Sequence, residues 1–127
     1  MAHAAPVLRA LLPKLKGWKI APPVIASQAG VALGDDIGER LGAAMVAILI
    51  GERPGLSAAD SLGIYLTWQP KIGRHDAERN CLSNIHPPDG MLYEDAAARL
   101  AWLMHEGRAR RLTGIALKDD GAALALD

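Results

Sequence analysis

The chain has 127 residues, which is the size of one ordinary domain. Half of its residues are hydrophobic and 22% are charged, unlike an intrinsically disordered chain, which combines low hydrophobicity with high net charge. Lys and Arg total 14, and Asp and Glu also total 14. This balance excludes a whole-molecule positive field that would collect nucleic acid or anionic lipid.

The sequence predicts a cytoplasmic protein without a transmembrane helix. Its single cysteine, Cys81, cannot form an internal disulfide, and the N-terminal residues lack the apolar segment of a signal peptide. The longest apolar stretch, residues 41–50, is about half of the ~20 residues that span a bilayer.

The first part of the chain predicts a helical lead-in over residues 1–21. Val7, Leu11 and Leu15 form a helical stripe, and Pro13 should end the helix early.

A strand over residues 24–26 and a short helix over residues 36–42 are expected next. The strand is apolar and follows two prolines. Asp36 and Glu39 have the spacing of a capping box, and Gly42 stands where a left-handed C-cap belongs.

The rest of the chain predicts further strands and one long helix. Residues 44–50 are apolar without alternation, which is typical of an inner strand covered on both faces. Residues 64–68, 81–85 and 112–117 favour three more strands, and residues 96–108 repeat apolar side chains at helical spacing.

Together these elements predict the α/β class, as a single Rossmann-like domain with a mainly parallel sheet flanked by helices. The domain would span residues 22–118, with a helical turn near residues 57–60, a polar loop over residues 69–79 and a flexible tail over residues 119–127.

The loop after the strand of residues 44–50 is the first candidate site, because ligands bind at the carboxyl ends of strands in open α/β sheets. Glu52 could accept a hydrogen bond from a ligand, and Arg53 could bind a phosphate. The alternative is a tight loop with an internal Glu–Arg pair. The segment has neither a Walker A nor a GxGxxG pattern.

Other polar residues have simpler interpretations. Cys81 beside Arg79 could be an activated nucleophile, but a buried structural cysteine is commoner. Asp35 and Asp36 could form a carboxylate pair, although a position at a helix start explains them better.

Cations and histidines give no specific signal. A basic loop could be solvated surface or could meet an anion; it contains Lys71, Arg74 and Arg79. No metal site is expected, because the four histidines lack zinc-binding spacing; they are His3, His75, His86 and His105.

Residues 50–85, with the sequence IGERPGLSAADSLGIYLTWQPKIGRHDAERNCLSNI, resemble the C-terminal domain of the small (light) subunit of ethanolamine ammonia-lyase. The likeness continues back through GVALGDDIGERLG at residues 30–42 and forward to LTGIALKD at residues 112–119. It therefore covers nearly the whole chain after Pro22.

The resemblance implies an adenosylcobalamin-dependent carbon–nitrogen lyase that converts ethanolamine to acetaldehyde and ammonia. The enzyme would be a hetero-oligomer, active only when a large barrel subunit is present, and it could lie within a bacterial microcompartment. Val31, Glu52 and Cys81 would be cofactor-binding, and no residue of this chain would be catalytic or bind a metal. We expect these three residues to gather on one rim of the domain.

The chain departs from the family pattern in two ways. The family has an N-terminal region before this domain, which suggests a truncated subunit here. Leu92 stands where the family commonly has a helix-capping Ser, and His75 is also atypical.

Two other functions stay open at this point. A noncatalytic module could dock a large subunit or a microcompartment component without turnover. A free-standing nucleotide-binding domain fits the coarse pattern but lacks a phosphate-binding fingerprint. If the lyase interpretation holds, the isolated chain should bind cobalamin weakly, because so small a domain can offer only one face to the corrin ring.

Overall fold

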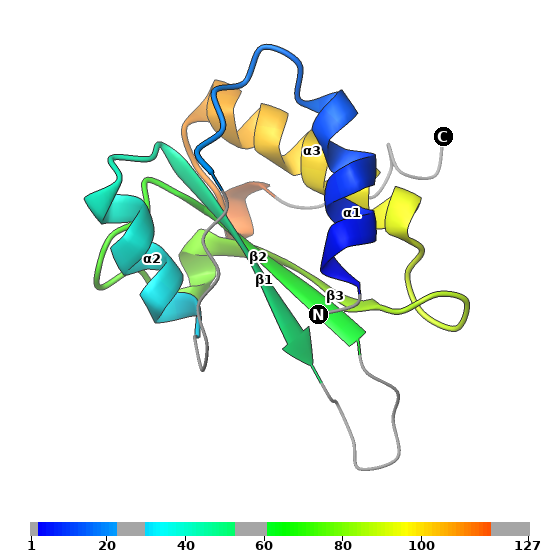
Figure 1. Cartoon of the computed structure of the whole chain (residues 1–127). Helices are drawn as coiled ribbons and strands as arrows, with labels where there is room; N and C mark the ends of the chain where they lie inside the picture. The colour runs from blue at the N-terminus through cyan, green and yellow to red at the C-terminus, as the bar shows by residue number, and fades with distance from the viewer. Residues whose placement is uncertain (1–2, 23–29, 53–60, 118–127) are drawn as a thin grey trace.

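The computed structural model describes residues 3–22, 30–52 and 61–117. Within these ranges three strands form one sheet, joined by three α-helices and three short 3₁₀ helices (Figure 1). The elements are α1 (Ala4–Leu11), η1 (Leu12–Lys14), α2 (Val31–Arg40), β1 (Met45–Glu52), β2 (Ser61–Trp68), η2 (Asp76–Glu78), β3 (Arg79–Ile85), α3 (Tyr93–Arg110) and η3 (Ile115–Leu117).

The described strands pair in the order β1-β2-β3, and both pairings are antiparallel. The predicted mainly parallel, Rossmann-like sheet is therefore wrong for the part of the chain that the structure describes. The inner strand of this sheet is β2, and β1 lies at an edge, so the prediction of an inner strand over residues 44–50 is also wrong. The predicted strand over residues 24–26 lies outside the described residues.

The apolar run was misleading because β1 has apolar side chains on both faces although it is an edge strand. Met45, Ala47 and Leu49 pack against the core, while Val46 and Ile48 lie under α2. An antiparallel edge strand between helices therefore has the same sequence pattern as an inner strand of a parallel sheet.

The pairing of β2 with its two neighbours determines which side chains share a face. Tyr65 lies opposite Ile48 on β1 and opposite Cys81 on β3. Because side chains alternate along a strand, every second residue points to the same side. We call the side that carries Tyr65 the outer face. It is formed by Val46, Ile48, Ile50, Glu52, Ser61, Gly63, Tyr65, Thr67, Arg79 and Cys81.

The hydrophobic core lies on the opposite face, where α1 and α3 pack together over the sheet (Figure 1). Val7, Leu11 and Leu15 are buried there, as the helical stripe predicted, and Pro13 lies in η1 just after α1 has ended. The predicted amphipathic helix is confirmed as α3. The sheet and α3 contribute Leu62, Ile64, Leu66, Leu82, Ile85, Ala96, Ala97, Leu100, Ala101 and Met104.

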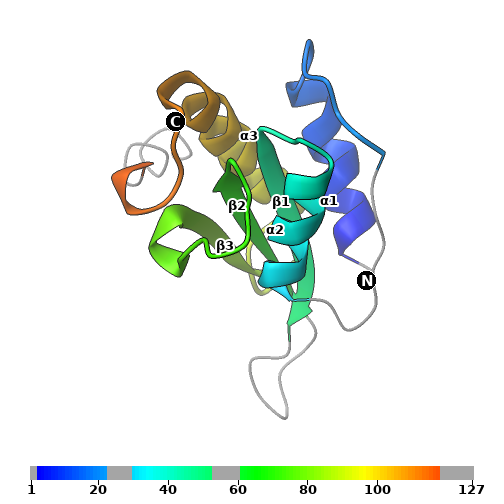
Figure 2. The same cartoon turned by 90° about the vertical axis from the view of Figure 1, so that its left-hand side faces the viewer.

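Helix α2 lies on the outer face, with α1 and α3 on the far side of the sheet (Figure 2). It begins earlier than predicted, at Val31 after Gly30, so Asp36 is not a helix cap. The predicted left-handed residue after this helix is confirmed, since Gly42 has φ +67°.

Residues 112–117 form no strand, contrary to the prediction. Side chains hold this segment instead: Thr113 Oγ1 donates to the carbonyl of Glu78 at 2.6 Å and accepts from the backbone N–H of Trp68 at 2.8 Å. Asn80 Oδ1 accepts from the N–H of Gly114 at 2.7 Å. The predicted turn near residues 57–60 and the tail over residues 119–127 lie outside the described residues.

Candidate functional site

The candidate site is the end of the outer face that α2 leaves free among the described residues. α2 approaches β1 closely because it has glycines on the side toward the sheet. A Cβ atom on Gly38 would lie 3.4 Å from Cβ of Val46, and one on Gly34 would meet the side chain of Ile48. The helix therefore runs antiparallel to β1. Each turn of the helix covers about two residues of the strand.

This progression determines where the first residue of α2 lies. Val31 precedes Gly34 by three residues and thus lies about one turn nearer the helix start, on the same side of the helix. Since Gly34 lies over Ile48 and α2 runs antiparallel to β1, Val31 lies at the end of α2 that is nearer the end of β1. Its side chain is half-buried.

Glu52, the last residue of β1, folds its side chain over β2. A Cβ atom on Gly63 would lie 2.7 Å from Cδ of Glu52, closer than real Cβ contacts occur, and would also overlap Oε1. The carboxylate therefore occupies the space that the missing Gly63 side chain leaves. A glycine inside a strand often marks such a close approach.

Tyr65 lies between Glu52 and Cys81 on the outer face. It follows Gly63 by two residues on β2 and faces Cys81 directly across the β2–β3 pairing. The Tyr65 and Cys81 side chains are close enough for each to shift the pKa of the other. These residues thus form a continuous polar line across all three strands.

The Tyr65 hydroxyl and the Cys81 thiol are both neutral at physiological pH. The charge that Cys81 carries when ionised, followed by burial and the Glu52 carboxylate, raises the pKa of Tyr65 above its ordinary 10.0. Although Cys81 is exposed as a residue, desolvation of its thiol against the sheet is the main cause raising its pKa above 9.0, and the Glu52 charge raises it further. The activated-nucleophile interpretation of Cys81 is thus disfavoured. The alternative interpretation, that Cys81 is a buried structural cysteine, is also wrong, because the residue is exposed.

The structure brings Glu52 and Cys81 together around Tyr65, and Val31 is the first residue of the helix that packs on the same face of the sheet. Arg53, the other candidate of this loop, lies outside the described residues. Sequence reasoning missed Tyr65 and Gly63. The glycine inside an otherwise apolar strand was a signal for Gly63, but only the strand register shows that Tyr65 joins the group.

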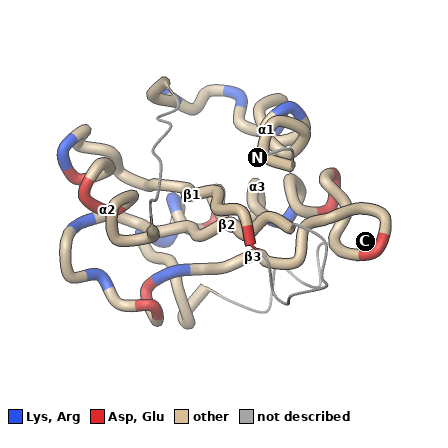
Figure 3. The backbone as a smooth tube through the Cα atoms, turned by 60° about the horizontal axis from the view of Figure 1, so that its bottom comes forward, with Lys and Arg blue, Asp and Glu red and all other residues tan. Residues whose placement is uncertain are grey.

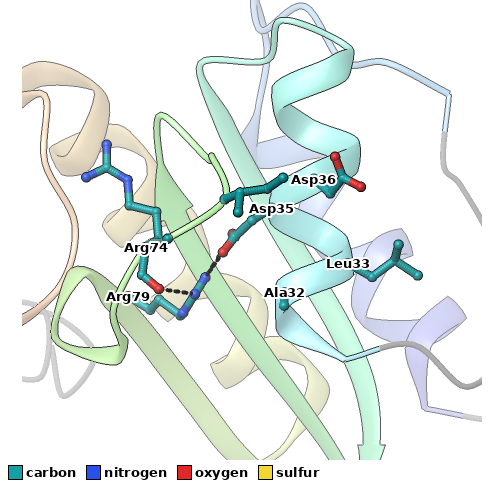
Figure 4. Close-up of a pocket in the computed structure, with 8 residues that line it drawn as sticks. Ala32, Leu33, Asp35, Asp36, Arg74 and Arg79 are labelled. Carbon is teal, nitrogen blue, oxygen red and sulfur yellow. Dashed lines mark hydrogen bonds and ion pairs between the residues drawn. The ribbon is translucent and has the colours of Figure 1, made fainter.

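Away from this group of residues, a hollow of about 310 Å³ lies between α2 and the loop before β3 (Figure 4). Its charged groups are already paired: Arg79 Nη1 is 2.6 Å from Asp35 Oδ2, and Arg74 Nη1 is 3.1 Å from Glu78 Oε1. In the close-up Asp35 points toward Arg79, while Leu33 points away from it. Because of these pairings, neither arginine is a free anion-binding group. Asp35 lies in the middle of α2, not at its start as predicted.

Charged residues gather around α2 and the loop before β3, whereas β1 and β2 are largely uncharged (Figure 3). Among the described residues, no three His, Cys, Asp or Glu side chains are grouped in a way that could hold a metal ion. No helix in the described ranges is long and apolar enough to cross a membrane.

Comparison with known proteins assigns the family. The family model described as "Ethanolamine ammonia-lyase light chain (EutC)" matches residues 1–118. The chain belongs to this family. The resemblance detected in the sequence is thereby confirmed.

Similar relatives carry the name "Ethanolamine ammonia-lyase small subunit". The protein of Rhodopseudomonas palustris is 57% identical over 121 residues, covering 94% of this chain and 46% of that protein. The protein of Azotobacter vinelandii is 51% identical over 127 residues, covering 98% of this chain and 47% of the relative. That of Bradyrhizobium diazoefficiens is 56% identical over 124 residues, with coverages of 95% and 47%.

The light-chain family member described here thus spans about half the length of the curated relatives it matches. The name of these relatives states that each is the small subunit of a lyase. A small subunit implies a larger partner for those proteins.

Proposed function

We propose that this chain supplies the cofactor-contacting surface of an adenosylcobalamin-dependent ethanolamine ammonia-lyase. Together with a large barrel subunit it would convert ethanolamine to acetaldehyde and ammonia. One observation carries the proposal: in a member of the light-chain family, Glu52 and Cys81 lie near Tyr65 on the outer face, and the helix that begins at Val31 packs on the same face.

The outer face suits the chemical character of this cofactor. A corrin ring is broad and flat, and its edge carries amide side chains. Ile50 is half-buried and offers apolar area, and Val31 extends this area at the helix start. Glu52 lies flat over Gly63 instead of projecting into the ligand space. The described residues therefore fit a flat ligand with polar edges.

The residues of this chain would bind and orient the cofactor and exclude water from one side of it. Glu52 would accept hydrogen bonds, and the apolar side chains would cover the ring. Adenosylcobalamin supplies the difficult chemistry, the homolysis of its cobalt–carbon bond. The neutral Cys81 thiol fits a contact role, since it places no negative charge beside Glu52.

Reconstitution tests the proposal. The purified chain is mixed with an ethanolamine ammonia-lyase large subunit, adenosylcobalamin and ethanolamine, and acetaldehyde is measured. We expect turnover that depends on both chains. A complex that forms without producing acetaldehyde would instead support the noncatalytic docking module.

Cofactor binding is measured separately by equilibrium dialysis. The isolated chain should bind cobalamin weakly, because sites for large ligands bury most of the ligand surface and are often formed between subunits. Submicromolar binding by the chain alone would overturn this expectation. Glu52→Ala should weaken cofactor retention in the complex and leave the circular dichroism spectrum of the isolated chain unchanged.

A further inference from the structure

We propose that Tyr65 and Glu52 form a donor–acceptor pair that recognises a primary carboxamide at the edge of the bound cofactor, and that Gly63 positions the carboxylate of this pair. The inference rests on the proposed function and deepens it. It assigns binding and positioning roles to two residues, Tyr65 and Gly63, outside the three that the resemblance indicated.

The Glu52 carboxylate and the Tyr65 hydroxyl are together complementary to a primary carboxamide. An ionised carboxylate only accepts hydrogen bonds, whereas a tyrosine hydroxyl also donates one. A primary carboxamide has N–H donors on one side and a carbonyl acceptor on the other. Glu52 can therefore accept from the amide nitrogen while Tyr65 donates to the amide oxygen.

The Glu52 carboxylate and the Tyr65 hydroxyl also lie near each other on the outer face. Tyr65 lies one strand away from Ile48 and two residues beyond Gly63, over which the Glu52 carboxylate lies. The carboxylate and the hydroxyl thus occupy neighbouring positions on the same face, beside the apolar part of the outer face. The edge of a ring lying on Ile50 would meet both groups.

The Tyr65 hydroxyl proton can also serve a ligand. Tyr65 faces Cys81 across the β2–β3 pairing, and a neutral thiol is only a weak acceptor. An amide carbonyl is a better acceptor, so the hydroxyl can donate to a ligand without giving up a strong hydrogen bond.

Gly63 is the positioning residue of this arrangement. Any side chain there would overlap Oε1 and Cδ of Glu52 and displace the carboxylate from β2. Gly63 touches no ligand in this account. Its substitution should therefore mimic the loss of the Glu52 carboxylate while Glu52 is still present.

The test compares cobalamins that differ at one amide. Cyanocobalamin and its monocarboxylic acids, each with one peripheral amide hydrolysed, are dialysed against the complex of this chain with the large subunit. For at least one acid we expect binding about tenfold or more weaker than for the parent, because a ligand carboxylate would meet Glu52. Glu52→Gln should remove most of this discrimination.

Variants of the chain test each role. Tyr65→Phe should weaken cyanocobalamin binding about 3- to 10-fold, the loss of one hydrogen bond, and Gly63→Ala should lower the amide-to-acid discrimination as Glu52→Gln does. The matched control is Tyr93→Phe, which removes the hydroxyl of the other tyrosine, on α3, where it contacts His3. This control should bind like wild type.

The outcomes separate this inference from the proposed function. If the wild-type complex binds cyanocobalamin but accepts every acid equally, or if Tyr65→Phe binds as well as wild type, the carboxamide pair is wrong and the proposed function stands. If the wild-type complex binds no cobalamin, both are wrong. Should Gly63→Ala fail to fold, the Tyr65→Phe and Glu52→Gln results decide alone.

Discussion

Arg79 and Asp35 form a buried ion pair that joins the start of β3 to the middle of α2, with Nη1 of Arg79 2.6 Å from Oδ2 of Asp35. Their side chains are only 8% and 2% exposed. Arg79 also donates to Thr67 Oγ1 at 3.2 Å and to the carbonyl of Arg74 at 2.9 Å. One guanidinium thus ties α2, β2 and the loop before β3 together.

Arg79→Met should lower the free energy of unfolding by about 3–5 kcal/mol, because it leaves the Asp35 carboxylate buried without a partner. Urea denaturation measures this loss. Replacing both partners by apolar residues, Asp35→Leu with Arg79→Met, should recover much of it.

Arg74→Met is the control for this substitution. Its ion pair with Glu78 is partly exposed and should cost less than about 1 kcal/mol. Equal losses for Arg74→Met and Arg79→Met would contradict the special role of the buried pair.

Gly38→Ala should destabilise the fold even though alanine is the better helix former. A Cβ atom there would lie 2.6 Å from Cγ of Pro70, a rigid ring that cannot move aside easily. Overpacking of about 1–3 kcal/mol outweighs a gain in helix propensity of about 1 kcal/mol. We expect a net loss of about 1 kcal/mol by thermal or urea unfolding.

The Pro70→Ala background tests the cause of this loss. With the ring absent, the propensity gain should prevail, and Gly38→Ala should become neutral or stabilising. If the sign does not change, Pro70 is not the group that Gly38 accommodates.

The sequence pattern located most described elements but not their pairing. Helical spacing identified α1 and α3, and apolar runs identified all three strands. Periodicity says nothing of strand direction, which depends on connections. Residues 53–60 between β1 and β2 are fewer than the dozen or so that a parallel crossover needs, a signal that favoured antiparallel pairing.

Only part of the candidate site was predictable from the sequence, because the site also depends on strand pairing. The three expected contact residues came from family resemblance, and two of them lie on strands whose pairing brings them near Tyr65. Tyr65 and Gly63 have no local sequence pattern that marks them as site residues beyond the glycine itself. Their role depends on cross-strand neighbours, which single-sequence periodicity does not specify.

Leu92→Ser should stabilise the chain. Leu92 is the N-cap residue of α3 and makes no side-chain hydrogen bond to the first turn, and its side chain is about half exposed. A serine hydroxyl would accept a hydrogen bond from a free backbone N–H, which typically contributes about 1 kcal/mol. Urea denaturation should show this gain, whereas Leu92→Ala should show none.

The pH dependence of Cys81 alkylation tests the arrangement of the site most directly. Burial is the main cause raising the pKa of Cys81 above 9.0, the Glu52 charge raises it further, and the hydrogen bond from Tyr65 lowers it. The rate of reaction with iodoacetamide should therefore reach half its maximum above pH 9.0 in the folded chain. In urea the midpoint should return to the ordinary value.

Two variants should shift this midpoint in opposite directions. Glu52→Gln removes a negative charge beside the thiolate and should lower the pKa of Cys81. Tyr65→Phe removes a donor to the thiolate and should raise it. Because the folded chain holds the Cys81 proton more tightly than the unfolded chain, the stability linked to this group is present below pH 9.0 and is lost as pH rises through the folded pKa. A midpoint that neither substitution moves would mean that Glu52 and Tyr65 do not lie beside Cys81, and the carboxamide pair would then lose its structural basis.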